Sequence, residues 1–167
     1  VITGYNIFAF DYTYLFKRAY KNNLKSFGIM SKINNFNAEK LTELSLSSSA
    51  LGDNILRFPE TPGRVLIDMY KFIQKDYALD SYKLDDVSTL FLYKEKANVP
   101  PQEIFYKQHG SNKDRQDVAM YCILDCILPI NLMRKLDVIQ KNAAMSNVCK
   151  VPMNFLFTRG QGIKLFS

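Results

Sequence analysis

The sequence predicts an α/β protein with few strands and many helices. Short apolar or alternating runs, which are typical of strands, lie at residues 1–3, 41–58 and 64–70. Longer stretches in which apolar residues recur with helical spacing lie between these runs and fill the second half of the chain. A length of 167 residues with a hydrophobic content of 47% is sufficient for one ordinary domain with a core.

The first strand and helix are predicted at the start of the chain. The run "VIT" is typical of a strand, "GYN" of a turn, and "DYTYLFKRAYKNN" of a helix that begins at Asp11. In that helix Leu15, Phe16 and Ala19 can face inward. An aspartate at a helix start is favoured as an N-cap, which gives Asp11 an ordinary structural explanation.

A loop, a hairpin and a third strand are predicted next. Residues 32–40 read as a loop, and residues 41–58 read as a hairpin with a flexible, Ser-rich tip. The run "RVLIDMY" then predicts a strand that leads into the helix "KFIQKDY". Asp68 lies at the end of this strand, where it either caps the helix or supports a nearby site.

Helices are predicted for most of the remaining chain. They cover "SYKLDDVSTLFLY", "NVPPQEIFYKQH", residues 114–141 and the segment after Pro152. Pro129 is expected to mark a kink or joint in the long stretch. We find no apolar run that approaches the length needed to span a bilayer, so we expect no membrane partner.

Charge and cysteine content narrow the class of protein only partly. A net charge of +6 fits a polyanionic partner such as nucleic acid, but it equally fits a soluble basic surface. The cysteines lack zinc spacing, so Cys122 and Cys126 are predicted to be small core residues of a reduced, intracellular protein. His109 lies in a loop, which argues against a histidine-based metal site or triad. Because the sequence lacks a starting Met, we expect a piece of a longer protein.

Tyr121 and Asp125 form the first candidate site. They are separated by one helical turn and therefore lie on one face of the predicted helix. Their apolar neighbours, among them Val118, Cys122 and Leu128, predict that this stretch is largely buried. A buried aspartate costs several kcal/mol unless it is paired, hydrogen-bonded or metal-bound. Either Asp125 forms a satisfied polar pocket with Tyr121, or it binds a metal while Tyr121 holds a water.

The stretch "GYNIFAFDYTYL" forms the second candidate site. Asn6 and Asp11 flank the aromatic residues Phe8 and Phe10 at a strand-to-helix junction. Helix capping alone would explain Asp11. The pattern Asn-x-x-x-Phe-Asp followed about 110 residues later by Tyr-x-x-x-Asp is much rarer than either motif by itself.

These motifs resemble the 3′–5′ proofreading exonuclease domain of family B DNA polymerases, of the polymerase delta and large-DNA-virus type. "GYNIFAFDYTYL" is similar to the second exonuclease motif of that family, and "YCILD" is similar to the third. "GRVLIDMYKFIQKDYALDSYKLDDVS" resembles the connecting segment, and "VPMNFLFTRGQGIKLFS" resembles the segment that leads to the polymerase palm. The resemblance implies a ribonuclease H-like fold that lacks its N-terminal strands, with residues 1–142 in the exonuclease domain and residues 143–167 in a helical extension.

The resemblance also implies a two-metal hydrolysis of the 3′ terminal nucleotide of DNA. Asp11 and Asp125 would be two of four acidic ligands of two Mg²⁺ ions, or of Mn²⁺, because hard cations favour carboxylate oxygens. Tyr121 would orient the attacking water. Asn6 and Phe10 would shape the pocket for the terminal nucleotide, with Phe8 and Phe10 as stacking candidates. The parent protein would also bind deoxynucleotides and a sliding clamp, in the nucleus or in a viral replication compartment.

The sequence departs from the family pattern in ways that leave alternatives open. The first exonuclease motif, Asp-x-Glu, and the palm motifs are absent, so we expect the isolated chain to be inactive or nearly so as a nuclease. Gly162 stands where the family usually has Gln. A catalytically inactive, nuclease-like domain for DNA binding or architecture is one alternative. A free-standing exonuclease of the same superfamily is another.

Overall fold

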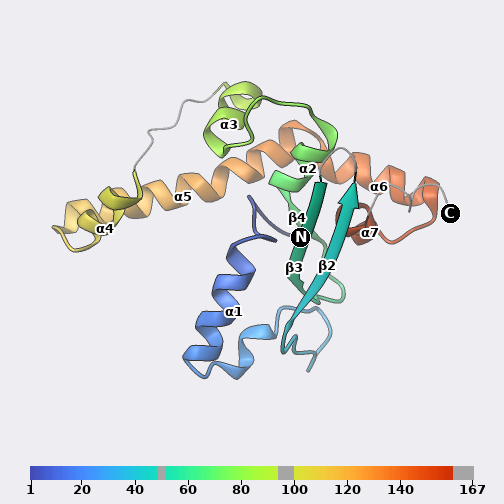
Figure 1. Ribbon diagram of the computed structural model, residues 1–167, viewed down its shortest axis with the longest axis horizontal. Coiled ribbons are helices and arrows are strands. Elements are labelled where there is room, and N and C mark those ends of the chain that lie inside the picture. Colours follow the sequence, from blue (N-terminus) through green and yellow to red (C-terminus); the bar gives the residue numbers. More distant parts are fainter. Residues whose placement is uncertain (49–51, 94–99, 160–167) are drawn as a thin grey trace. The chain divides into compact units, whose positions relative to one another are not determined.

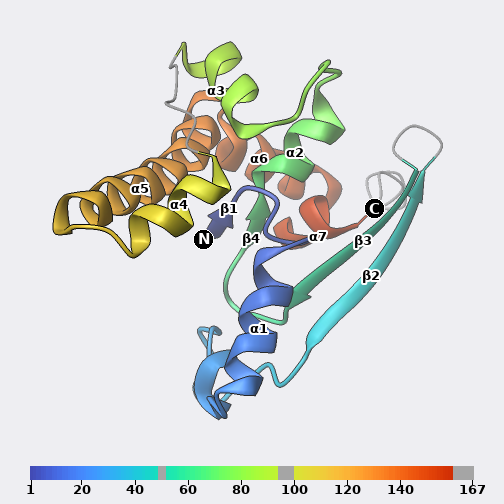
Figure 2. The same ribbon diagram turned by 60° about the vertical axis from the view of Figure 1, so that its left-hand side comes forward.

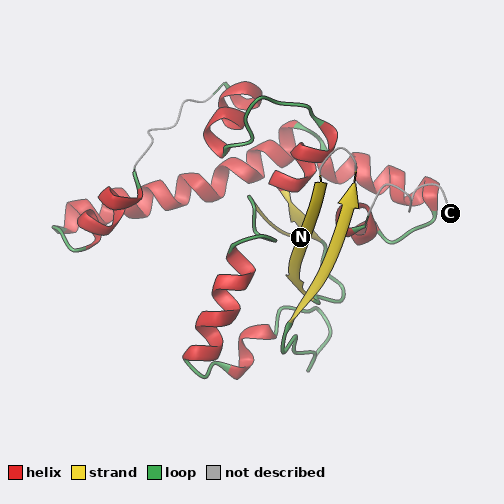
Figure 3. Cartoon of the chain, in the orientation of Figure 1, coloured by secondary structure: helices red, strands yellow, loops and turns green. Residues whose placement is uncertain are grey.

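The computed structural model describes residues 1–48, 52–93 and 100–159 as a mixed α/β protein (Figure 1). The chain forms two compact units, one made of Val1–Ala78 and Ile139–Ser167 and the other of Leu79–Val138. Helices make up most of the described residues, and the strands described all belong to the first unit (Figure 3). This confirms the predicted α/β class with few strands and many helices.

The first unit contains two small sheets. Strand β1 (Ile2–Gly4) pairs in parallel with β4 (Leu66–Asp68), while β2 (Leu41–Ser48) pairs antiparallel with β3 (Gly52–Pro59). The β2–β3 pair forms a long hairpin (Figure 1, Figure 2). The predicted strand ends, loop and hairpin are confirmed, whereas the predicted flexible tip lies outside the described residues.

Among its described residues, the first unit contains three helices that the sequence predicts and two that it does not place as observed. Those predicted are α1 (Asp11–Lys21), α2 (Met69–Asp76) and α7 (Met153–Thr158). The short 3-10 helix η1 (Lys25–Gly28) was not predicted, and α6 (Val138–Cys149), which lies in this unit from residue 139, extends beyond the end predicted near residue 141. Helix α7 is tied to β4 by one side chain: the Leu66 N–H donates to Oδ1 of Asn154 (3.1 Å), and Nδ2 of Asn154 donates to the Arg64 carbonyl (3.0 Å). The amide of Asn154 thus bonds the edge of β4 as a neighbouring strand would.

The core of the first unit is aromatic and aliphatic. Phe8, Tyr12, Leu56 and Leu66 form a buried cluster that joins α1 and its preceding turn to β3 and β4. The predicted inward face of α1 is confirmed at the buried Ala19 and the half-buried Phe16, but Leu15 is 42% exposed and Tyr12 is buried. The reason is helical spacing, since Tyr12 lies seven residues before the buried Ala19 and therefore shares its face.

The second unit consists of helices. Helix α5 (Asn112–Lys135) is contacted by α3 (Leu84–Leu92) and α4 (Pro101–Gln108), and α4 runs beside it (Figure 1, Figure 2). A capping box begins α5: the Asp114 N–H donates to Oγ of Ser111 (3.2 Å), and the Ser111 N–H donates to Oδ2 of Asp114 (2.8 Å). Pro101 starts α4 at a position where its missing N–H is harmless.

The sequence predicts a kink or a break between helices at Pro129, but the break lies further along the chain. Helix α5 continues through the buried Pro129 to Lys135, and the break before α6 comes at Leu136 and Asp137. Asp137 has a left-handed backbone with φ of 55°, which ends the helical hydrogen-bond series. The turn residue, and not the proline, separates the two helices.

The expectation about apolar length was wrong for α5. Among the described residues, this one helix of 24 residues is long and apolar enough by length and composition to cross a membrane, with a best-window mean hydropathy of 1.3. Long helices in the cores of water-soluble proteins meet the same criterion, so length and composition assign no membrane to it.

Candidate functional site

The carboxyl ends of β1 and β4 meet at one edge of their sheet. The parallel register places Gly4 opposite Asp68, so the turn after β1 and the start of α2 leave the sheet side by side. Gly4 is required where the turn begins, because a Cβ there would lie 2.5 Å from Cγ2 of Ile7. This edge carries the stretch predicted as the second candidate site.

Asp68 organises this edge. It is 2% exposed, and its carboxylate accepts three backbone hydrogen bonds: Oδ1 from Asn6 (2.7 Å) and Tyr70 (3.0 Å), and Oδ2 from Phe8 (3.0 Å). Burial raises the pKa of Asp68, and the backbone N–H groups oppose that rise. The predicted capping of α2 is confirmed by the Tyr70 bond. The bonds to the β1–α1 turn were not predicted, because their partners lie about sixty residues earlier in the chain.

Asp11 is the first residue of α1, and Phe10 takes the N-cap position. Asp11 therefore does not serve as the N-cap that the sequence suggested, although its charge suits the first turn of a helix. The side chain is half-buried, and burial raises the pKa of Asp11. Burial, together with the nearby charges of Asp68 and Asp11, raises the pKa of Tyr12 to about 12. The turn thus holds a carboxylate in a partly desolvated, negatively charged environment.

The two aromatic residues of the turn have opposite exposures. Phe8 is fully buried against Tyr12 and Phe58, with ring centroids 6.3 Å and 5.4 Å away. Its ring has no open face for a base, so the structure supports a core role for Phe8 and not the stacking role. Phe10 is 63% exposed and stacks on Tyr14 with centroids 6.0 Å apart. Phe10 therefore presents an aromatic surface beside Asp11.

Tyr121 and Asp125 lie on one face of α5, as predicted, and both are half-buried. The surrounding stretch is more exposed than predicted: Cys122 and Cys126 are exposed, so their assignment to the core was wrong. The buried face of α5 instead includes Leu128 and Leu132, which follow Tyr121 and Asp125 at helical spacing. Cys122 and Cys126 come one residue after Tyr121 and Asp125, respectively, so they lie beside that face and not on it.

The candidate residues are divided between the two units. Asn6, Phe8, Phe10 and Asp11 belong to the first unit, and Tyr121 and Asp125 belong to the second. Each group is brought together within its own unit. The convergence of Asp11 with Asp125 stays a prediction.

The donor chemistry suits a hard divalent cation only in part. Within the described ranges, no group of three or more His, Cys, Asp or Glu side chains is gathered as a metal site. Both oxygens of Asp68 already accept backbone N–H groups, which leaves Asp11 as the carboxylate of the turn that can meet a cation. Carboxylate oxygens are the ligands that Mg²⁺ prefers, so Asp11 and Asp125 fit such an ion by chemistry.

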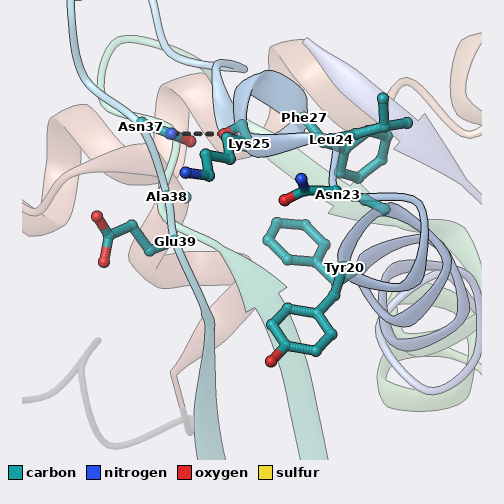
Figure 4. Close-up of a pocket in the computed structure, with 11 residues that line it drawn as sticks. Tyr20, Asn23, Leu24, Lys25, Phe27, Asn37, Ala38 and Glu39 are labelled. Carbon is teal, nitrogen blue, oxygen red and sulfur yellow. Dashed lines mark hydrogen bonds between the residues drawn. The ribbon is translucent and has the colours of Figure 1, made fainter.

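A separate pocket lies at the other end of α1 (Figure 4). It has a volume of about 580 Å³ and is lined by Tyr20, Leu24 and Phe27 among others, with Nδ2 of Asn37 donating to the Lys25 carbonyl (2.8 Å) at its rim. Ten residues of helix separate Asp11 from Lys21, which corresponds to roughly 15 Å of axial rise. The pocket is therefore not part of the junction that holds Asp11.

Comparison with known proteins identifies the class of this chain. The family model for the exonuclease domain of family B DNA polymerases matches residues 1–87, slightly more than half of the 167 residues. The chain belongs to this family. The match includes the whole β1–α1 turn, the β2–β3 hairpin and the β4–α2 junction.

Similar proteins of known type align with the entire chain. The DNA polymerase of Pyramimonas orientalis virus is 34% identical over 224 aligned residues, which cover 100% of this chain and 19% of the relative. The DNA polymerase delta catalytic subunits of Dictyostelium discoideum and Schizosaccharomyces pombe are each 38% identical over 167 residues. In each of these two cases the alignment covers 100% of this chain and 15% of the relative. The chain thus spans less than a fifth of the length of the relatives that it matches.

Proposed function

We propose that this chain is part of a DNA-directed DNA polymerase of family B and contributes to its proofreading 3′–5′ exonuclease. The observation that carries the proposal is the half-buried Asp11 in a fixed turn, within the region that matches the family. We assign residues 1–142 to the exonuclease domain, of ribonuclease H-like fold, and residues 143–167 to the segment that leads toward the polymerase domain. DNA, deoxynucleotides and a sliding clamp are proposed partners of the whole protein, in the nucleus or a viral replication compartment.

Asp11 and Asp125 are proposed to bind divalent cations, Mg²⁺ or Mn²⁺, through their carboxylate oxygens. When bound, such ions neutralise charge on the scissile phosphate and make a bound water a stronger nucleophile. The partial burial of Asp11 supports this role, because a desolvated carboxylate binds a cation more strongly than one in water. In the proposed hydrolysis the water oxygen forms a bond to the phosphorus, and the bond from phosphorus to the 3′ oxygen of the penultimate nucleotide breaks. That oxygen takes up a proton to become the new 3′ hydroxyl of the shortened strand, the water gives up one proton, and the terminal nucleotide leaves as a nucleoside 5′-monophosphate.

Tyr121 and the β1–α1 turn are proposed to position the reactants. The Tyr121 hydroxyl can hydrogen-bond the attacking water, since the residue lies one helical turn from Asp125 on the same face. The exposed Phe10 ring can stack on the terminal base, and stacking tolerates any base because each has an aromatic face. The Asn6 amide can bond the terminal nucleotide from the start of the same turn.

Substitution of the two aspartates tests the proposal. In the full-length protein that carries this chain, Asp11→Ala and Asp125→Ala should each slow trimming of a single-stranded 3′ end in Mg²⁺ by about a thousandfold, since loss of a cation ligand removes several kcal/mol of charge stabilisation. Asp117→Ala is the control, because Asp117 is an exposed carboxylate on the same helix as Asp125. Normal trimming by both Ala variants would refute the proposal, and DNA binding without any trimming by the parent would favour the inactive alternative.

A further inference from the structure

We propose that Asp68 is a positioning residue for the exonuclease site, which it serves by fixing the turn that carries Asn6, Phe10 and Asp11. The inference rests on the proposed function of that turn. Asp68 would touch neither the DNA nor a cation. It would act through the backbone of residues 6–10.

The bonding pattern of Asp68 separates this role from ordinary helix capping. An N-cap needs one bond to the first turn of its own helix, and the Tyr70 N–H supplies it here. The two further bonds, from the N–H groups of Asn6 and Phe8, go to a different element. A carboxylate suits this task because both of its oxygens are acceptors, whereas an amide offers only one.

The bonds to Asp68 fix one defined conformation of the turn. Asn6 has a φ of 61°, in the left-handed region, which Asn adopts more readily than most residues with a Cβ. With Asn6 held there, its carbonyl accepts hydrogen bonds from the N–H groups of Ala9 (3.3 Å) and Phe10 (3.2 Å). These bonds close the turn directly before Asp11, the first residue of α1.

The same turn is also held from the hairpin. The Arg57 N–H of β3 donates to the Phe8 carbonyl (3.1 Å), and the Phe8 ring fills the core. Phe8 is thus fixed through its N–H, its carbonyl and its ring, while Phe10 and Asp11, two and three residues later, remain accessible. Fixed supporting groups next to accessible functional groups are what an organised binding site needs.

Burial of an ionised carboxylate is unfavourable, which supports a specific reason for Asp68 in this position. A smaller neutral residue such as Ser would cap α2 without that penalty. Ser would, however, be too short to reach the turn as well. The charge of Asp68 also interacts favourably with the nearby Lys71 ammonium: burial lowers the pKa of Lys71, and the charge of Asp68 opposes that shift, so the carboxylate serves the turn and this cation together.

Two substitutions distinguish the hydrogen bonds that Asp68 accepts from the turn from the one by which it caps α2. Asp68→Ser leaves an acceptor for the Tyr70 N–H but removes the bonds to the turn. Asp68→Asn retains one oxygen for Asn6 and Tyr70 but places an amide donor against the Phe8 N–H. Leu156→Ala is the matched control, because Leu156 is 2% exposed and lines the same small pocket as Asp68, so its loss disturbs packing there while the Asp68 carboxylate is retained.

Amide hydrogen exchange gives a readout that is independent of activity. In the full-length protein, both Asp68 variants should exchange the amide of Phe8 at least tenfold faster, since a hydrogen bond to a charged group is lost. The α2 amides should keep their protection in Asp68→Ser. The half-saturating Mg²⁺ concentration for trimming, and the dissociation constant for an oligothymidine in EDTA, should each rise about tenfold. Leu156→Ala should lower the melting temperature without these changes.

Outcomes for Asp11 and Asp68 distinguish failure of this inference from failure of the proposed function. Normal trimming by Asp11→Ala would overturn the proposed function, whatever the Asp68 variants do. If Asp11→Ala abolishes trimming while the Asp68 variants keep parental exchange at Phe8, or behave like Leu156→Ala in Mg²⁺ and oligonucleotide binding, the positioning role is wrong. If Asp68→Ser does not fold, Asp68→Asn decides between the same two results.

Discussion

The β1–α1 turn and the Tyr121–Asp125 stretch of α5 each present an aspartate beside an aromatic residue, but they are built differently. The turn is held by hydrogen bonds that its N–H groups donate to Asp68, about sixty residues away, and by one that its Phe8 carbonyl accepts from the Arg57 N–H of the hairpin. In α5 the two side chains share a face simply because they are one helical turn apart. One group of candidate residues therefore depends on tertiary contacts, while the other depends on local helix geometry.

This difference predicts different responses to mutation. A change near the turn should alter stability and geometry together, because Phe8 belongs both to the turn and to the core. A change on α5 should alter chemistry with little effect on the fold, since much of the stretch around Tyr121 is exposed. Four experiments compare the two regions.

The largest contrast should be in stability. Phe8→Ala should lower the free energy of unfolding by about 3–5 kcal/mol, because it removes a fully buried ring and leaves a cavity. Leu124→Ala, at a 47% exposed position of α5, should change it by about 0.5 kcal/mol or less. Urea denaturation measures both. An equal loss for Leu124→Ala would mean that this flank of α5 is buried in solution.

The next effect should be on chemistry at α5. Tyr121→Phe removes only the hydroxyl, so trimming should slow by about 10–100-fold, as for other residues that orient a metal-site group. The free energy of unfolding should fall by about 1 kcal/mol or less, the usual contribution of one hydrogen bond, because the ring remains. Tyr106→Phe, at an 83% exposed position of α4, is the control. A normal trimming rate for Tyr121→Phe would remove the hydroxyl from the mechanism.

A smaller effect is expected on DNA binding by the turn. Phe10→Ala should weaken binding of a single-stranded 3′ end by about 1–3 kcal/mol, the usual contribution of one base stacked on an aromatic ring. The free energy of unfolding of this variant should change little, since the Phe10 side chain is 63% exposed. Tyr20→Ala removes a 90% exposed ring from the far end of α1 and should bind normally. Equal weakening by both variants would indicate a nonspecific aromatic surface.

The smallest effect concerns the pH dependence of stability. Burial raises the pKa of Asp11 above its ordinary value of 3.8, so its ionisation destabilises the folded state as pH rises through the raised pKa. Asp11→Asn should therefore be slightly more stable than the parent at neutral pH in EDTA. That advantage should disappear below pH 3.8, where the carboxyl group is protonated in both folded and unfolded states. Thermal melts across this pH range measure the stability difference between Asp11→Asn and the parent. A difference that does not change with pH would contradict the prediction.

Local patterns accounted for most elements but not for their contacts. The start of α1, the hairpin, the β4–α2 junction and the helix after Pro152 follow from periodicity and turn residues. Ala19 of α1 is buried as predicted, but Leu15 was wrongly assigned to the inward face, and the cysteines at 122 and 126 of α5 were wrongly assigned to the core. Both errors arose because periodicity defines a face only approximately, and the tertiary neighbours decide which edge of that face is covered.

The candidate site shows the same division. The candidates Asn6, Phe8, Phe10, Asp11, Tyr121 and Asp125 were proposed from their spacing and from the family resemblance, and the burial of Phe8 favours a core role for it instead. The role of Asp68 toward the turn could not be identified, because no local pattern links it to Asn6 and Phe8. A buried aspartate at a strand end was the only available signal.

The sequence alone determined the approximate positions of most helices and strands and that Tyr121 and Asp125 share a helix face, since these properties depend on near neighbours along the chain. Only the tertiary structure decided that Phe8 is core while Phe10 is exposed, and that Asp68 binds the turn before Asp11. The physical reason is that burial and long-range hydrogen bonds depend on the parallel pairing of β1 with β4, which joins segments more than sixty residues apart.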